Sequence, residues 1–122
     1  MAKNEQPIIF TTPEFAEQGK NLAEQTGGEF GNDFLQNERF RDDWTHGHIR
    51  DVTRSVQDRH VLWLSDFSRP ENFFQNMAIP AAMAAYGARI LHVICPFFPV
   101  GTMERVEKEG DIVTAIIMMR FF

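Results

Sequence analysis

A chain of 122 residues is long enough for one domain with a core that folds without metal or disulfide support. With 43% hydrophobic residues, and with 12 Lys and Arg against 17 Asp and Glu, the composition excludes a disordered chain and argues against a protein that coats nucleic acid. The single cysteine excludes an internal disulfide, and no signal, transit or long apolar segment is evident, so we expect a cytoplasmic protein that does not enter membranes.

The first half of the chain begins with a strand, a turn and a helix. Ile8-Ile9-Phe10 is a short apolar run, and Thr12 and Pro13 suit the N-cap and the first position of a helix. Gly27-Gly28 predicts the end of that helix. Between residues 29 and 58, aromatic residues stand among polar ones, and we expect short strands joined by polar loops.

The second half shows a clearer alternation of strand and helix. Val61 to Leu64 is a continuous apolar run, typical of a strand buried on both faces of a parallel sheet. Ser68 and Glu71 have the spacing of a capping box, and a helical period with Pro80 inside it follows as far as Gly87. A second apolar strand covers residues 89–95, and a helix-like segment covers residues 110–122. The apolar positions of the central helix are Phe73, Phe74, Met77, Ala78, Ala81 and Ala82.

This alternation predicts an α/β protein, a three-layer sandwich with a mainly parallel sheet and helices on both faces. We expect a single domain over residues 1–122, because the chain shows no repeat and no linker. Ligands of such sheets bind beyond the carboxyl ends of the strands. The segments expected there are residues 11–14, 65–71 and 96–111.

Two of the loops carry residues suited to nucleotide binding. In the stretch 96–111, the hydroxyl of Thr102 and the guanidinium of Arg105 suit phosphate oxygens, while its carboxylates suit a phosphate that carries magnesium. In the turn from Phe40 to Trp44, an aromatic face beside a carboxylate suits a purine. The alternatives are a solvated connection for the first loop and, for the second, a hairpin whose aromatic residues pack into the core.

Other chemistry-bearing residues favour structural roles. His46 and His48 would share one side of a strand, but a metal site there would need further ligands, and a polar loop is favoured. His60 and His92 flank apolar strands as structural residues. Cys95 is interpreted as a buried core thiol.

The segment from Val61 to Ala115 resembles the N-terminal domain of ribose-phosphate diphosphokinase (phosphoribosyl pyrophosphate synthetase), most closely the plant-type class. The resemblance rests on the irregular string from Pro96 to Arg105, which continues through Glu109-Gly110-Asp111. Weaker matches lie at residues 7–10 and 40–44. The resemblance implies a phosphoribosyltransferase-like fold.

Members of this family transfer a diphosphoryl group from magnesium-ATP to ribose 5-phosphate for nucleotide biosynthesis. The resemblance implies ATP and ribose 5-phosphate as ligands, Mg²⁺ as the ion that accompanies ATP, and assembly into homo- or hetero-oligomers. It assigns no catalytic residue and no metal ligand to this chain. The implied ATP contacts are Phe40, Asp42, Asp43, Trp44, Thr102, Met103, Glu104, Arg105 and Glu107.

The family's metal and ribose-phosphate segments follow the part that this chain resembles, so we expect a chain truncated at its C-terminus and inactive alone. The apolar segment from Ile112 to Phe122 is expected to drive self-association. Two alternatives remain. One is a non-catalytic regulatory or assembly subunit of a phosphoribosyl pyrophosphate synthetase complex, and the other is an unrelated flavodoxin-like binding module.

Overall fold

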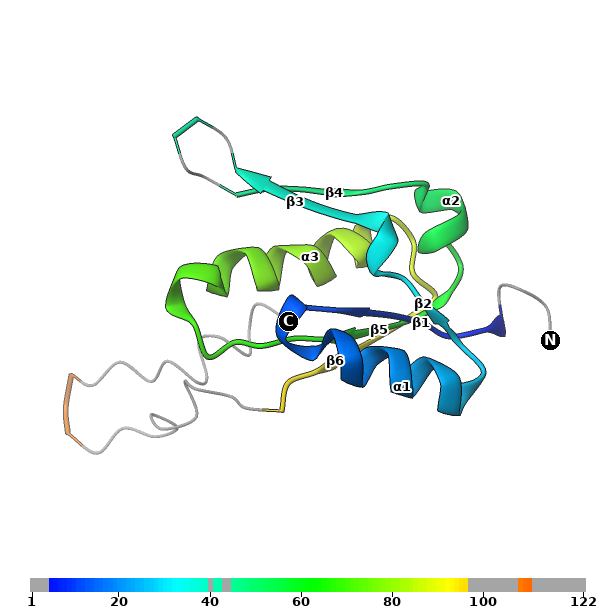
Figure 1. Cartoon of the computed structure of the whole chain (residues 1–122). Helices are drawn as coiled ribbons and strands as arrows, with labels where there is room; N and C mark the ends of the chain where they lie inside the picture. The colour runs from blue at the N-terminus through cyan, green and yellow to red at the C-terminus, as the bar shows by residue number, and fades with distance from the viewer. Residues whose placement is uncertain (1–4, 40, 43–44, 97–107, 111–122) are drawn as a thin grey trace.

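A parallel sheet forms the centre of the protein. The computed structural model describes residues 5–39, 41–42, 45–96 and 108–110 (Figure 1). Four strands lie in the order β2-β1-β5-β6, and every neighbouring pair is parallel. The predicted parallel sheet is confirmed. Its strands are β1 (Ile8–Thr11), β2 (Glu29–Phe30), β5 (His60–Leu64) and β6 (Ile90–Ile94).

Two helices cover opposite faces of this sheet. Helix α1 (Ala16–Thr26) connects β1 to β2, and helix α3 (Phe73–Ala85) connects β5 to β6. The first crossover moves outward from β1 and the second moves outward from β5 in the opposite direction. Because such crossovers are right-handed, the two helices must lie on different faces, as Figure 1 shows. The three-layer α/β architecture is therefore as predicted.

An antiparallel hairpin lies outside α3. Strand β3 (Leu35–Arg39) pairs with β4 (Thr45–Ile49), and the short helix α2 (Val52–Ser55) leads back toward the sheet (Figure 1). Three turns of 3-10 helix, at Pro13–Phe15, Asn32–Phe34 and Pro70–Asn72, join the other elements. The expectation of short strands and loops between residues 29 and 58 is confirmed.

The main core lies between the sheet and α3. Alternate residues of the strands point to this side, as the period of a strand requires. On the other face, α1 approaches β1 closely at Gly19, where an added Cβ would meet the side chains of Thr11 and Phe30. The buried cluster on the α3 side comprises Ile8, Phe10, Ile49, Val56, Val61, Trp63, Ile79 and Met83.

The helix ends follow the sequence signals, but the buried side of α3 does not. Gly27 follows α1 with a φ of 68°, and Gly87 lies two residues after α3 with a φ of 93°, conformations that favour glycine. The apolar positions read from the sequence do not coincide with the buried side of α3. The helix is apolar on nearly all sides, so the sequence does not show which of its sides faces the core. The residues that it buries are Asn76, Ile79, Pro80 and Met83.

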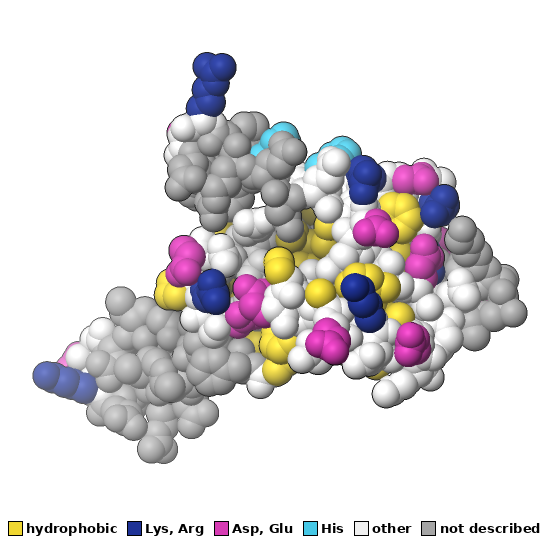
Figure 2. Space-filling view, viewed as in Figure 1, with side chains coloured by type: hydrophobic (Ala, Val, Ile, Leu, Met, Phe, Trp, Pro, Cys, Tyr) yellow, Lys and Arg dark blue, Asp and Glu magenta, His cyan; other side chains and the backbone are white. Residues whose placement is uncertain are grey.

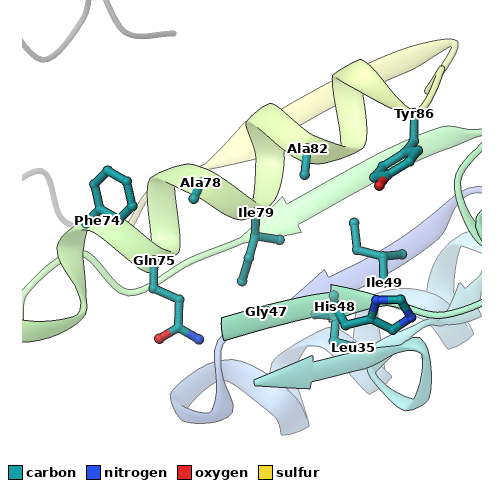
Figure 3. Close-up of a pocket in the computed structure, with 10 residues that line it drawn as sticks. All are labelled: Leu35, Gly47, His48, Ile49, Phe74, Gln75, Ala78, Ile79, Ala82 and Tyr86. Carbon is teal, nitrogen blue, oxygen red and sulfur yellow. The ribbon is translucent and has the colours of Figure 1, made fainter. Parts of the chain in front are cut away.

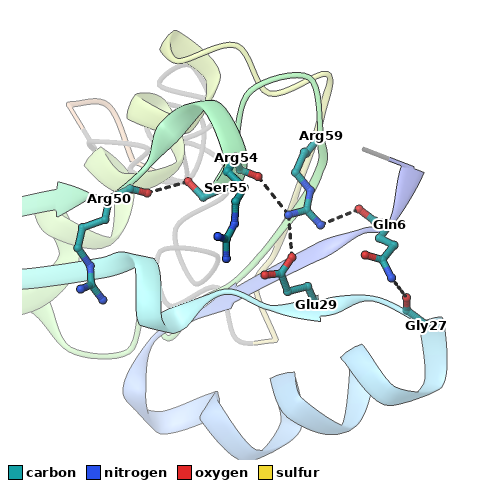
Figure 4. A network of polar contacts seen from close by, with 7 residues as sticks. All are labelled: Gln6, Gly27, Glu29, Arg50, Arg54, Ser55 and Arg59. Carbon is teal, nitrogen blue, oxygen red and sulfur yellow. Dashed lines mark hydrogen bonds and ion pairs between the residues drawn. The ribbon is translucent and has the colours of Figure 1, made fainter. Parts of the chain in front are cut away.

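A buried arginine joins three segments at the amino edge of the sheet, where the strands begin (Figure 4). The side chain of Arg59 is 2% exposed. It donates to the Glu29 carboxylate at 2.9 Å, to the Gln6 carbonyl at 3.1 Å and to the Arg54 carbonyl at 3.3 Å. A buried guanidinium requires such partners, because desolvation of an unpaired charge is costly.

Charges of both signs are interspersed over the face seen in Figure 2. Among the residues that the structure describes, no helix has the length and apolar character needed to cross a membrane.

Candidate functional site

The candidate site lies at the carboxyl edge of the sheet, between β1 and β5. The chain leaves β1 toward one side of the sheet and β5 toward the other, so this is the point where the strand order reverses. Ligands of open α/β sheets bind at such a switch point. The amide of Thr12 donates to the Leu64 carbonyl at 3.1 Å, and the amide of Ser65 donates to the Ile94 carbonyl at 3.0 Å. The three strand exits are therefore adjacent, as predicted.

Thr12 joins the exits of β1 and β5 through its side chain. Its hydroxyl oxygen accepts a hydrogen bond from the amide of Asp66 at 3.0 Å, and the residue is only 3% exposed. Thr12 does stand at the N-cap position of the Pro13–Phe15 turn, but its side chain makes no capping hydrogen bond. The N-cap position expected of Thr12 is confirmed, but its hydroxyl accepts from the neighbouring loop instead of capping the helical turn.

Asp66 places a carboxylate at this edge. The amide of Ser68 donates to its Oδ1 atom at 2.8 Å. Hydrogen bonds from the side chain and backbone of Ser68, with a smaller effect of the Arg69 charge, lower the pKa of Asp66 below its usual value. The capping box expected of Ser68 and Glu71 is absent, because Ser68 instead forms this turn and Arg69 precedes the helical turn. Asp66 is therefore an anion at neutral pH.

Asn76 anchors α3 to the same loop. Its Nδ2 atom donates to the Asp66 carbonyl at 2.7 Å, and its own carbonyl accepts from the Trp63 indole at 3.1 Å. The residue is 7% exposed. Asn76 was not predicted as a site residue, although a lone asparagine within an apolar helical run is a signal of a buried polar contact.

Asn32 secures the exit of β1 from the other side. Its Oδ1 atom accepts from the Thr11 amide at 2.8 Å, and its Nδ2 atom donates to the Thr11 carbonyl at 3.2 Å and hydroxyl at 2.9 Å. This residue was also not singled out, because it stands in a polar stretch that reads as a loop. The side chain extends the β1 hydrogen-bond ladder where β2 has ended.

A small cleft opens beside these contacts. It has a volume of about 150 Å³, and Glu14 supplies its carboxylate. The other groups are amides, a hydroxyl and the edge of an indole, which suit hydroxyl and amine groups of a ligand. The lining residues are Thr12, Pro13, Glu14, Trp63, Asn72, Gln75 and Asn76.

The two predicted nucleotide loops are only partly within the described residues. Asp42 is exposed in the turn of the β3–β4 hairpin, and the structure confirms a hairpin there. In the other predicted loop, residues 96–111, Pro96 lies within the described residues and is exposed. The predicted ATP contacts that lie outside the described residues are Phe40, Asp43, Trp44, Thr102, Met103, Glu104, Arg105 and Glu107.

The remaining candidates take peripheral positions. His46 and His48 are exposed on one face of β4. Cys95 is half-buried, so the expectation of a fully buried thiol is wrong: it follows the last residue of β6, where the sheet ends. Within the described ranges, no group of three His, Cys, Asp or Glu side chains could hold a metal ion.

The chain is similar in sequence to several plant enzymes. It is 38% identical over 66 residues to ribose-phosphate pyrophosphokinase 3, chloroplastic, from Oryza sativa subsp. japonica, which covers 54% of this chain and 16% of that protein. It is 34% identical over 67 residues to ribose-phosphate pyrophosphokinase 3, mitochondrial, from Spinacia oleracea, with 55% and 16% covered. Ribose-phosphate pyrophosphokinase 4 from Oryza sativa subsp. japonica is 35% identical over 65 residues, with 53% and 20% covered. No family model matches the chain.

The fold is similar to that of a solved enzyme structure. The crystal structure of phosphoribosylpyrophosphate synthetase from Mycobacterium smegmatis superposes with a TM-score of 0.79 and 13% sequence identity, covering 96% of this chain and 38% of that one. Over about half of its length, the chain resembles ribose-phosphate pyrophosphokinases. The predicted resemblance, including its plant-type character, is confirmed. The matched segment of the chain spans only about a fifth or less of the length of these plant pyrophosphokinases.

Proposed function

We propose that this chain supplies the ATP-contacting N-terminal part of a ribose-phosphate diphosphokinase, which transfers a diphosphoryl group from magnesium-ATP to ribose 5-phosphate. The observation that carries the proposal is the 34–38% identity to ribose-phosphate pyrophosphokinases over about half of the chain. The fold supports it, since the similar phosphoribosylpyrophosphate synthetase structure covers 96% of the chain.

The positions of the strands next to the two predicted nucleotide loops also support the proposal. Gly47 and Gln75 line one groove, so the turn end of the hairpin lies beside the start of α3, at the carboxyl edge. The segment that follows β6 leaves the sheet at this edge as well. We assign adenine contact to residues 40–44 and phosphate contact to residues 102–107. The described residues beside these segments, at the start of β4 and the end of β6, lie at the same end of the molecule as the cleft at Thr12.

The protein would accelerate this reaction mainly by positioning the substrates and neutralising the phosphate charges, because phosphoryl transfer needs little covalent chemistry from the protein. Magnesium is proposed to arrive with ATP, whose phosphate oxygens are the hard ligands that this ion prefers. The ionised Asp66 would repel a bare phosphate but would tolerate one that carries magnesium. Assembly into oligomers and a cytoplasmic location belong to the same proposal; plant relatives are named as chloroplastic and mitochondrial.

Titration of the chain with magnesium-ATP tests the assignment. In a spectrum of the backbone amides, we expect saturable shifts at Asp42 and in the loop from Ser65 to Ser68. An Asp42→Asn variant should bind roughly tenfold more weakly, since it loses a hydrogen bond to a charged acceptor. Asp58→Asn is the matched control, because Asp58 lies in the turn before β5, at the opposite edge. No saturable shift with magnesium-ATP, or equal binding by Asp42→Asn, would refute the assignment.

A further inference from the structure

A second hollow lies between the hairpin and α3 (Figure 3). Its volume is about 330 Å³, within the range of small-molecule pockets. Gly47, His48 and Ile49 contribute from β4, and side chains of α3 form the facing wall. We call this hollow the hairpin groove.

Small side chains in the walls create the space. Gly47 has no side chain, and Ala78 and Ala82 offer only methyl groups toward the hairpin. Ile49 and Ile79 close the bottom of the groove, and both belong to the buried core. Figure 3 shows Ile79 pointing from α3 toward β4 and Ile49 pointing back from β4. The groove therefore has an apolar floor, and small side chains line the middle of its α3 wall.

The groove has few polar side chains, namely His48, Gln75 and Tyr86. None of its ten lining residues is Lys, Arg, Asp or Glu, although these make up 24% of the chain. Gln75 offers an amide donor and acceptor, and Figure 3 shows it pointing toward the start of the groove near Gly47. At the opposite end lies the ring of Tyr86, which is 55% exposed.

We propose that the hairpin groove binds an uncharged, planar aromatic compound with one hydrogen-bonding edge. The faces of such a ring would contact Ile49 and Ile79, and Gln75 would bond its edge. A small ring system fits the volume of about 330 Å³, and the lining offers it apolar contacts and no charged side chain. None of the proposed ATP contacts lines the groove, which shares only Gln75 with the lining of the edge cleft.

Methyl NMR with indole as the probe tests the proposal. Indole is a neutral flat bicycle with a single N–H donor. In the 122-residue chain, we expect saturable upfield ring-current shifts of the Ile49, Ile79 and Ala82 methyl groups, and none at Val61, on a sheet strand that does not line the groove. A general apolar association would instead move methyl groups across the molecule, which would overturn the proposal.

A pair of matched variants separates filling of the groove from general effects on the helix. Ala78 and Ala81 are both exposed on α3, but only Ala78 lines the groove. Ala78→Leu should weaken indole binding at least tenfold, whereas Ala81→Leu should leave it unchanged. Equal binding by the two variants, or no saturable shift up to the solubility of indole, would overturn the proposal.

Discussion

Arg59 is the residue on which the amino edge of the sheet depends most. Replacement by methionine keeps much of its volume but leaves the partly buried Glu29 carboxylate, which is 27% exposed, without its cation. We expect Arg59→Met to lower the free energy of unfolding by about 3 kcal/mol, the low end for breaking a buried pair, since Glu29 is partly solvated. Urea denaturation measures this loss.

Arg50→Met is the control for that substitution, because Arg50 is exposed beside α2. It should change the free energy of unfolding by less than about 0.5 kcal/mol. Equal losses in the two variants would show that the Arg59 network contributes nothing specific to stability.

His60 gives the fold a dependence on pH. Its ring lies 4.8 Å from that of His92, centroid to centroid. Burial, and then the charges of His92 and Arg89, lower the pKa of His60 below its ordinary value of 6.5. As the pH falls through that ordinary value, the unfolded chain takes up this proton before the folded chain does, and stability is lost.

We therefore predict that His60→Gln reduces the loss of unfolding free energy between about pH 7.5 and about pH 5.5. Thermal or urea unfolding at both pH values gives the difference. His48→Gln, on the exposed face of β4, should retain the full dependence of the wild-type protein. A pH dependence that is unchanged in His60→Gln would rule out this role for the imidazole.

At the scale of elements, the hydroxyl of Thr12 connects the exit of β1 to the loop after β5. Thr12→Val keeps the shape but leaves the Asp66 amide without its acceptor. We expect a loss of about 1–2 kcal/mol in unfolding free energy, together with faster hydrogen exchange at the Asp66 amide. Thr53→Val, at an exposed position of α2, should show neither effect. Unchanged exchange at Asp66 would contradict the connection.

The elements themselves could be predicted from the sequence because their signals are local. Continuous apolar runs gave the strands, and Gly27 and Gly87 gave the helix ends. The hydrogen bonds of Thr12 and Ser68 could not be predicted from the sequence. Each residue could cap a helix locally or bond to another loop residue, and only the tertiary structure decides between the two. Asn32 and Asn76 were missed for the same reason, since their partners lie 21 and 10 residues away along the chain.

At the scale of the whole molecule, the alternation of strand and helix predicted the sheet and its two helical layers. It also predicted the edge at which the candidate cleft lies, because parallel strands bring their carboxyl ends together. The hairpin groove could not be predicted, since it depends on how β4 packs on α3. That packing depends on which side of α3 faces the core, and the sequence of an almost wholly apolar helix does not show this.

The most direct test of the whole account is one ³¹P NMR experiment on the chain with ATP, magnesium and ribose 5-phosphate. We predict broadening or shifts of the ATP phosphate signals, which report binding. We also predict no signals of AMP or of a phosphoribosyl diphosphate product, because the match covers only 16–20% of the plant relatives. Unperturbed ATP signals would contradict the proposed ATP contact. Steady formation of AMP and product would contradict the assignment of only part of the active site to this chain.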